Sequence, residues 1–446
     1  MIYRLINNNL RMMLFVLFVF ALKSTTAQEV CNLSYCIEKG LEQNFGLQLV
    51  RNQEQIAGNN YTRGNAGMLP SVDASGRFGG SLNNTTQNMA DGATNSLIGI
   101  HNMNGSASVN LGLTIFRGFY VQNTYQKLGQ QFELSELNTQ MSIENLTARI
   151  ASEYYYYIQQ LILYDNMAYA VSLSRERVRI DEERYLLGGA SKVELLQSMV
   201  YLNADSSRYA RQKEVLRSSQ IRLNELMASE DLGNNITPAD TVIVLNENLN
   251  FDDLLNLTLE YNTSLLVAAK SQYISELDYK IIESRAYPYL NFSAGYGYNY
   301  NAYQSGAMSN QHLRGANYGL TMGVDIFDGF NRRRERENAR IEIDNRTIRY
   351  NEIEQEVKAD LLTIYYAYEN NLRLLRLEEQ NLEVARENLE IAMERYKLGS
   401  LSGIELREVQ KSLLDAEERL ISVKYMTKIA EISLLQISGN ILDYLS

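Results

Sequence analysis

The sequence has few of the residues that usually carry chemistry. Its 446 residues include only two histidines and two cysteines. His101 and His312 lie in polar stretches, and no group of histidines, cysteines and carboxylates has the spacing of a metal site. Gly-x-Ser-x-Gly, Walker and dinucleotide-binding motifs are also absent. The sequence therefore predicts no catalytic residues, no cofactor and no metal, and it argues against an enzyme.

Long hydrophobic runs and excess basic charge are also missing. After the N-terminus no segment reaches about 18 consecutive apolar residues, so no transmembrane helix is expected. An exported chain can still cross a membrane as a β-barrel. The formal net charge is −11, and it becomes −14 without residues 1–27, which hold three basic residues and no acidic ones. This acidic balance argues against a nucleic-acid partner.

The N-terminus has the pattern of a secretory signal peptide, expected over residues 1–27. Arg4 and Arg11 accompany an apolar run at 12–22 that is too short to span a bilayer, and small residues precede Gln28, where a signal peptidase would cut. A short anchor helix is the alternative. Cys31 and Cys36 follow closely. An oxidising compartment would permit a disulfide between them, and two unpaired thiols are equally compatible with the sequence.

Proline is rare, and two of the three prolines occupy equivalent positions in an internal repeat of the sequence. Pro70 returns as Pro288 at an offset of 218 residues. Two motifs recur at an offset of 211: 184–191 with 395–402, and 115–119 with 326–330. A unit of this length is too long for a solenoid repeat, so we expect two similar halves of one body. The difference in offset should lie in a loop, because loops tolerate deletions.

Pro70 and Pro288 each precede segments in which apolar and polar residues alternate, which is typical of strands. The expected strands are 70–82, 105–116, 288–300 and 316–327. Each is about as long as a tilted strand that crosses a hydrocarbon core. The residues that alternate with the apolar ones are small and polar, and aromatic residues gather at the ends of the strands. A soluble sheet with one wet face would show the same alternation. The polar segments 83–104 and 301–315 are expected to be exposed hairpin loops.

Four strands cannot enclose a channel, because about eight are the minimum for a small filled barrel. A strand edge left in lipid is not tolerated. We therefore expect the chain to assemble. Three copies would give a twelve-stranded barrel, and cyclic symmetry would close such a ring.

Two stretches without proline, 118–187 and 331–398, predict very long helices of roughly 100 Å each. Apolar residues seven apart indicate left-handed coiled coils. These seam positions are Tyr164, Val171, Val178 and Tyr185, their equivalents Leu375, Leu382, Leu389 and Tyr396, and then Leu195, Leu202, Tyr209, Leu406, Leu413 and Leu420. Gly188 and Gly399 look like helix-ending glycines. Ser191 and Ser402 look like N-caps, with Glu194 and Glu405 as capping-box partners.

The expected organisation is α+β, with two internal repeats around a linker. The segments are a signal peptide at 1–27, a first repeat at 28–228, a linker with one short strand at 229–250, and a second repeat at 251–446. The first repeat would hold a helix at 33–68, its two strands and a helical hairpin at 118–228. The second would hold a helix at 251–286, its two strands and a helical hairpin at 331–438.

This order resembles the TolC-like outer-membrane efflux protein family, the outer membrane factors, over nearly all of the mature chain. The motifs that carry the resemblance are Leu-Pro at 69–70 and Tyr-Pro at 287–288, Ile-Phe-x-Gly-Phe at 115–119 and 326–330, and Arg-Tyr-x-Leu-Gly-x-x-Ser-x-x-Glu-Leu at 184–195 and 395–406. The resemblance implies a homotrimer with a twelve-stranded β-barrel in the outer membrane and a twelve-helix α-barrel in the periplasm. It also implies docking to a periplasmic adaptor (a membrane fusion protein) and an inner-membrane pump, in efflux or type I secretion.

The resemblance also suggests functional residues at the hairpin tips. Candidates for the periplasmic gate are Glu194, Glu405, Glu408 and Tyr396. For the two capping glutamates, a role in the caps and a role in the pore both stay open. The adaptor contact maps to Gly188, Gly189, Ala190, Ser191, Gly399, Ser400, Leu401 and Ser402. Some family members have a basic residue at the position of Leu401 that helps to lock the closed state, and that lock is not expected here. A non-channel envelope scaffold is the alternative function.

Overall fold

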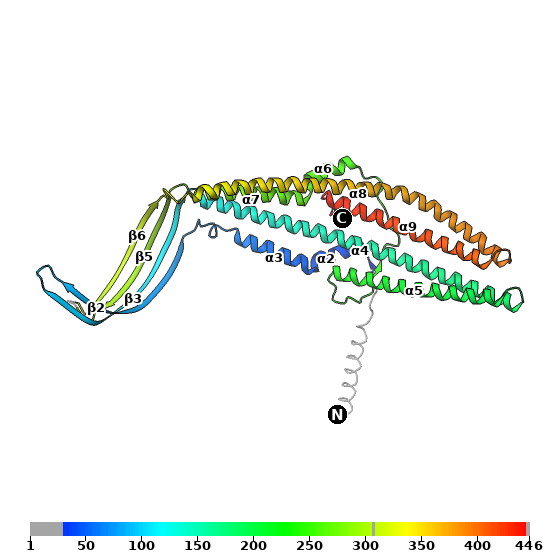
Figure 1. Cartoon of the computed structure of the whole chain (residues 1–446), viewed down its shortest axis with the longest axis horizontal. Coiled ribbons are helices and arrows are strands. Elements are labelled where there is room, and N and C mark those ends of the chain that lie inside the picture. The colour runs from blue at the N-terminus through cyan, green and yellow to red at the C-terminus, as the bar shows by residue number, and fades with distance from the viewer. Residues whose placement is uncertain (1–29, 306–307, 443–446) are drawn as a thin grey trace, which may run out of the picture. The chain divides into compact units, whose positions relative to one another are not determined.

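A computed structural model describes residues 30–305 and 308–442, which form two compact units (Figure 1). The expected signal peptide lies outside the described residues. The helical unit comprises residues up to 48, 143–260 and 358 onward, and the strand unit comprises 49–142 and 261–357. No helix among the described residues is long and apolar enough to cross a membrane.

The helical unit is a layer of long antiparallel helices. It contains α2 (Leu33–Gln43), α5 (Lys192–Leu226), α6 (Phe251–Tyr261), α9 (Gly403–Ile437) and the C-terminal parts of α4 (Tyr120–Leu186) and α8 (Asn331–Lys397). Figure 1 shows α5 returning beside α4, and α9 beside α8. Both α4 and α8 have 67 residues, and both α5 and α9 have 35. These equal lengths are the structural counterpart of the 211-residue offset in the sequence.

Side-chain contacts give the order of the helices in this layer. The rings of Tyr164 on α4 and Tyr209 on α5 lie 4.8 Å apart. On its other side α4 contacts α9, where the Gln159 amide lies 3.5 Å from the Ser422 hydroxyl. Next in the layer, α9 is paired with α8 by Arg419, whose Nε donates to a Glu378 carboxylate oxygen at 3.1 Å. In the body of the unit the order is therefore α5, α4, α9, α8, and α5 and α8 are the two edges. Nearer the turns, α8 also contacts α4 through Tyr396 and Asp181, and α9 also contacts α5 through Arg407 and Asp205.

The linker packs onto the core of the helical unit. Ile236 and Ile243 are buried with Tyr154, Ile158 and other residues of α4, α5 and α9. The linker's short strand is β4 (Thr237–Pro238), and it pairs in parallel with β1 (Val30–Cys31). A hydrogen bond joins the linker to α9, since the backbone N–H of Asn246 donates to the Glu431 carboxylate at 3.1 Å. This carboxylate is buried and also accepts from Lys428 Nζ of the same helix at 2.9 Å.

The thiols of Cys31 and Cys36 are buried, and their Sγ atoms lie 3.0 Å apart. The hydrogen bond between them, together with burial, raises the pKa of the Cys36 thiol. The structure thus brings the two cysteines together, and their oxidation to a disulfide stays a prediction.

The strand unit is built on one antiparallel sheet. Its strands are β2 (Ser71–Asn88), β3 (Thr94–Arg117), β5 (Tyr289–Ala302) and β6 (Asn310–Gly323), in the order β2-β3-β5-β6. The unit also contains most of α3 (Phe45–Asn60), α7 (Thr263–Ser284) and the N-terminal parts of α4 and α8. Two differences from expectation stand out. The segment 83–104 is mostly paired strand rather than loop, and β6 ends at Gly323 rather than near 327.

The Ile-Phe-x-Gly-Phe motif forms the corner between strand and long helix. Gly118 and Phe119 have φ of 56° and 65°, and Gly329 and Phe330 have φ of 69° and 64°. A Cβ on Gly118 would lie 2.2 Å from the Ser284 carbonyl oxygen, so only glycine fits there. The motif recurs because the chain makes the same left-handed corner twice.

Candidate functional site

The candidate site is the tip of the helical unit, where two helical hairpins turn back. Each long helix ends in a Schellman motif. The Gly189 N–H donates to the Arg184 carbonyl at 2.7 Å, and the Ser400 N–H donates to the Arg395 carbonyl at 2.9 Å. Gly188 and Gly399 take φ of 76° and 78°, a conformation that favours glycine. The predicted helix ends are confirmed at both glycines.

The return helices begin with capping boxes, as predicted. The Ser191 N–H donates to Glu194 at 2.8 Å, and the Glu194 N–H donates to the Ser191 hydroxyl at 3.3 Å. Ser402 and Glu405 repeat the pattern at 2.9 and 3.3 Å. Both glutamates therefore serve their own helices. A role in the pore stays a prediction.

The α9 capping box should respond to pH. The backbone N–H of Ser402, and then its hydroxyl, lower the pKa of the Glu405 carboxyl. A carboxyl whose folded-state pKa is lowered contributes stability above its ordinary pKa and loses it as pH falls through the folded-state value. We expect the amide hydrogens in the first turn of α9 to lose protection, measured against the intrinsic exchange rate at each pH, as the pH falls below the ordinary glutamate pKa of about 4.3. Hydrogen exchange of Glu405→Gln, compared with the parent chain across pH, measures this, and an equal pH response of both would contradict it.

Behind the turns, Tyr396 links α8 to α4. Its hydroxyl donates to Oδ1 of Asp181, and both side chains are almost fully buried. Burial, followed by the bond to Asp181, raises the pKa of Tyr396 to about 12, so the hydroxyl stays a donor at physiological pH. Arg177, also buried, holds its Nε 3.8 Å from Oδ2 of Asp181. A tyrosine, a carboxylate and a guanidinium thus meet where the two hairpins touch.

A second polar contact joins the hairpins between α5 and α9. Arg407 donates to both oxygens of Asp205, at 2.7 and 2.8 Å, and the Ser174 hydroxyl donates to the same carboxylate at 2.5 Å. The side chains of Asp205 and Arg407 are only 2% and 12% exposed, so this is a buried, bidentate ion pair. Three helices, α4, α5 and α9, are joined at one carboxylate.

The two contacts are connected through an aromatic ring. The guanidinium of Arg177 lies 5.0 Å from the centre of the Tyr201 ring, and that of Arg407 lies 5.1 Å from it. Such contacts are favourable when the cation is shielded from water. We call the whole set the tip cluster; it consists of Ser174, Arg177, Asp181, Tyr201, Asp205, Tyr396 and Arg407.

A cavity of about 550 Å³ opens beside the tip cluster, between the two hairpin tips. It is lined by Arg177, Asp181, Tyr396 and residues of both tips, among them Glu194 and the predicted docking segment 399–402. The other predicted docking segment, 188–191, does not line it. Glu408 is exposed on α9, away from the cavity. Of the four predicted gate residues, the structure places only Tyr396 at the contact between hairpins.

Sequence reasoning missed the charged members of the cluster. In the second half the predicted seam is correct, because Leu382, Leu389 and Tyr396 are buried. In the first half the equivalent Tyr185 is 40% exposed, and the seam lies one residue earlier and carries Arg177. The available signal was the pair Arg177 and Asp181, opposite charges four residues apart in a coiled coil. Such pairs usually lie on a solvated face, so the pair alone does not predict a buried cluster.

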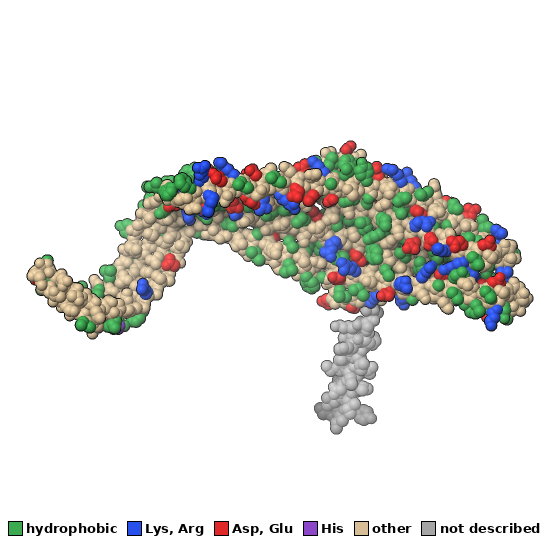
Figure 2. All heavy atoms as spheres, in the orientation of Figure 1, with side chains coloured by type: hydrophobic (Ala, Val, Ile, Leu, Met, Phe, Trp, Pro, Cys, Tyr) green, Lys and Arg blue, Asp and Glu red, His purple; other side chains and the backbone are tan. Residues whose placement is uncertain are grey.

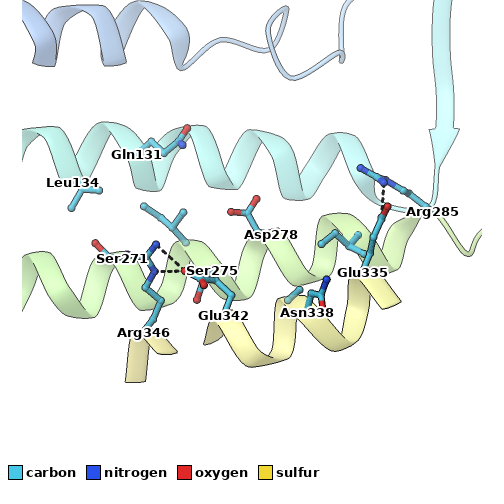
Figure 3. A pocket seen from close by; sticks show the side chains of 13 residues that line it. Gln131, Leu134, Ser271, Ser275, Asp278, Arg285, Glu335, Asn338, Glu342 and Arg346 are labelled. Atoms are coloured by element: carbon cyan, nitrogen blue, oxygen red, sulfur yellow. Dashed lines mark hydrogen bonds and ion pairs between the residues drawn. The ribbon is translucent and has the colours of Figure 1, made fainter. Parts of the chain in front are cut away.

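A second cavity, of about 800 Å³, lies in the strand unit between α4, α7 and α8 (Figure 3). Its charged side chains are paired: Arg285 with Glu335 at 2.9 Å, Arg346 with Glu342 at 2.9 Å, and Asp278 with Lys127 at 2.5 Å. These pairs connect neighbouring helices or successive turns. No group of three or more potential metal ligands occurs among the described residues.

Comparison with known proteins agrees with this architecture. Residues 254–440 match the family model described as outer membrane efflux protein. The fold is similar to the CmeC outer membrane channel of Campylobacter jejuni, with a TM-score of 0.76, 17% identity and coverage of 92% of this chain and 86% of that one. It is also similar to the outer membrane protein VceC of Vibrio cholerae, with a TM-score of 0.73, 14% identity and coverage of 91% of this chain and 96% of that one. For CusC the TM-score is 0.74, the identity is 16%, and the coverage is 91% of this chain and 92% of that one. Among curated proteins, none matches this sequence.

Proposed function

We propose that this chain is the outer-membrane exit duct of a tripartite efflux or type I secretion system. It belongs to the outer membrane efflux protein family, whose members are non-enzymatic transport channels. It would act as a passive homotrimer. The strands of three copies would form a twelve-stranded barrel in the outer membrane, and their helices would form a tunnel in the periplasm. The two halves of each chain, 28–228 and 251–446, would be repeats of one unit, as their equal helix lengths support.

The observation that carries the proposal is a pair of apolar stripes on the edge helices. On α8, an exposed apolar residue occurs every seventh position at Leu377, Val384 and Ile391, and the exposed Leu398 follows the helix at the same spacing. On α5, the opposite edge, Val193 and Val200 are likewise exposed and seven apart. A seven-residue spacing is the mark of a coiled-coil seam, and here the seam faces no other helix in the described part of the chain. A second copy, presenting α5 to α8, would cover both stripes.

The sheet also exposes apolar residues and open edges that a second copy could cover. Its edge strands are β2 and β6, and neither has a second neighbour among the described strands. Apolar side chains on the sheet are exposed, including Val109, Tyr318, Leu320 and Met322. Exposed apolar strands with open edges are what a barrel shared between copies would contribute. A lipid environment would cover the apolar face, and β6 of one copy would pair with β2 of the next.

The gate would be the helical tip. The tip cluster holds the two hairpins of one copy together, and the predicted gate residues Glu194, Glu405, Glu408 and Tyr396 lie near the same end. An adaptor docking at 188–191 and 399–402 would separate the hairpins and widen the tunnel. The energy would come from the partner pump, because this chain has no motif for binding a nucleotide.

The experiment is a measurement of mass and conductance. The mature chain, purified from bacterial outer membranes in detergent, should have the mass of three protein chains and should conduct ions when inserted in a planar bilayer. Conductance should be low in the closed state. A monomer that stays in solution without detergent would contradict the proposal. A trimer that never conducts, even with the tip cluster disrupted, would instead support the scaffold.

A further inference from the structure

The hairpin formed by β2 and β3 extends past the rest of the sheet, as Figure 1 shows. Pairing between β3 and β5 ends at Met103 with Ala302, whereas β2 and β3 stay paired as far as Asn88 with Thr94. We call residues 81–102 the arm. Only β2 and β3 form it, and its root is attached to the sheet by Gln304, which accepts a bond from the His101 N–H at 2.5 Å.

The arm is more strand than a membrane requires. β3 has 24 residues, whereas a tilted strand crosses the hydrocarbon core with about ten. The outer part of β3, Thr94–Asn102, adds about 30 Å at roughly 3.3 Å per residue. If the sheet is part of a barrel, the arm lies beyond the membrane, on the side opposite the helices that follow β3 and β6. The proposed channel does not use it.

The arm has no core of its own. Leu82 and Ile98 are 72% and 82% exposed, and Met89 at the turn is half exposed. The side-chain hydrogen bonds on the arm are local to the hairpin, for example the Gly99 N–H to the Asn84 side chain at 2.7 Å and Thr94 to Asn88 at 3.0 Å, and they bury no apolar face. A two-stranded hairpin without a packed face is marginally stable in water, and a third strand is the usual remedy. The arm therefore needs a partner to be well ordered.

The composition of the arm indicates the chemistry of that partner. Between Gly79 and Asn104 there is no lysine, arginine or aromatic residue, and Asp91 is the one charged residue. Figure 2 shows this part of the molecule as mostly neither charged nor hydrophobic. Apart from His101 at its root, the arm has no basic side chain for phosphate groups and no aromatic ring for sugars. What it offers is backbone N–H and carbonyl groups along two open edges. Natural proteins usually protect such edges with lysine or proline, and neither is present here.

We propose that the arms of the three copies pair with one another, strand edge to strand edge, across the outer mouth of the channel. The proposal rests on the trimer proposed above. In that ring β5 and β6 separate one arm from the next by about 14 Å, three interstrand spacings of ~4.8 Å. An arm of about 30 Å can lean across such a gap. The edge of β2 that carries the arm is also the edge that the trimer pairs with a neighbouring copy.

The test is cross-linking between copies. Two forms of the chain with different affinity tags are co-expressed, one with Thr86→Cys and the other with Ser96→Cys. Because each chain has one introduced cysteine, a disulfide between these positions can form only between copies. We expect a covalent dimer carrying both tags after mild oxidation. The buried Cys31 and Cys36 are the same in all chains, and the parent pair without introduced cysteines gives the background.

Substitution of the arm edges provides the matched control. Gln87→Lys in both tagged forms places a charge on the β2 edge without a like charge opposite it in the same hairpin, where Gln87 pairs with Asn95, and should lower the cross-link yield at least tenfold. Gln87→Thr, which is uncharged and favours strands, should leave the yield unchanged. A second cysteine pair, Ile391→Cys with Val200→Cys, reports the helical contact of the trimer. A cross-link there without one in the arm overturns the arm pairing and leaves the trimer standing. No cross-link at either site overturns both.

Discussion

Ile391→Arg is expected to separate the trimer into monomers. Ile391 is exposed in the single chain and lies in the middle of the α8 stripe. Burying an isoleucine contributes about 1.5–3 kcal/mol, and that contribution recurs at each of the three contacts. An arginine there would also lose hydration without gaining a partner, which costs several kcal/mol more. At about 1.4 kcal/mol for each factor of ten, each contact would weaken by at least about tenfold.

Light scattering in detergent measures the mass of the particle. Glu383→Arg is the matched control, because Glu383 is exposed on the same helix, about a quarter turn from the stripe, and should leave the trimer intact. A bacterium that depends on the channel for export should lose the function with Ile391→Arg and keep it with Glu383→Arg. If Ile391→Arg stays trimeric, α8 is not the contact between copies.

Asp205→Ala is expected to open the closed tip. It leaves Arg407 buried without its carboxylate and removes the acceptor of Ser174. Removal of one partner of a buried ion pair costs about 3–5 kcal/mol, because the remaining charge is uncompensated. Separation of the hairpins would return Arg407 to water and relieve that cost. In planar bilayers the variant should therefore conduct more than the parent trimer without any adaptor.

The double variant Asp205→Leu with Arg407→Leu separates loss of charge from loss of contact. An apolar pair of similar size often restores the stability of a buried ion pair, so the double variant should be closed again. Arg333→Ala is the control for a surface pair, since Arg333 and Glu337 are largely exposed, and it should change neither stability nor conductance measurably. If Asp205→Ala is as closed as the parent, the Asp205–Arg407 pair is not part of the gate.

The elements that the sequence predicts well are those fixed by local chemistry. The ends of the long helices follow from glycines at the turns and from Ser191 and Ser402 as caps, and the structure has them where expected. The helices expected at 33–68 and 251–286 are each two helices instead, α2 and α3 in the first case and α6 and α7 in the second. The Asn44 side chain accepts from the Leu47 N–H at 3.2 Å and donates to the Leu226 carbonyl at 3.1 Å. This second bond comes from α5, so no local pattern reveals it.

Long-range pairing explains the other differences. The arm has the asparagine, glycine and serine of a loop, and it becomes strand because β2 and β3 satisfy each other's backbone groups. The tip cluster depends on which side of α4 meets α8, and a one-residue shift of the seam puts Arg177 where Val178 is expected. Repeat symmetry predicts the lengths of the helices in the first half. It does not predict which face of each helix packs against its neighbours, because related halves can carry different side chains at equivalent positions.

This asymmetry has a mechanical consequence. The contacts that α4 and α5 make across to the other hairpin at the tip are largely hydroxyl, carboxylate and guanidinium groups, which water can replace. The seam between α8 and α9, with Leu389, Leu406 and Leu413, is apolar, and its exposure to water would be unfavourable. When the channel opens, the hairpin of α8 and α9 is thus suited to keep its internal packing and stay in place. The hairpin of α4 and α5 is suited to be the part that moves.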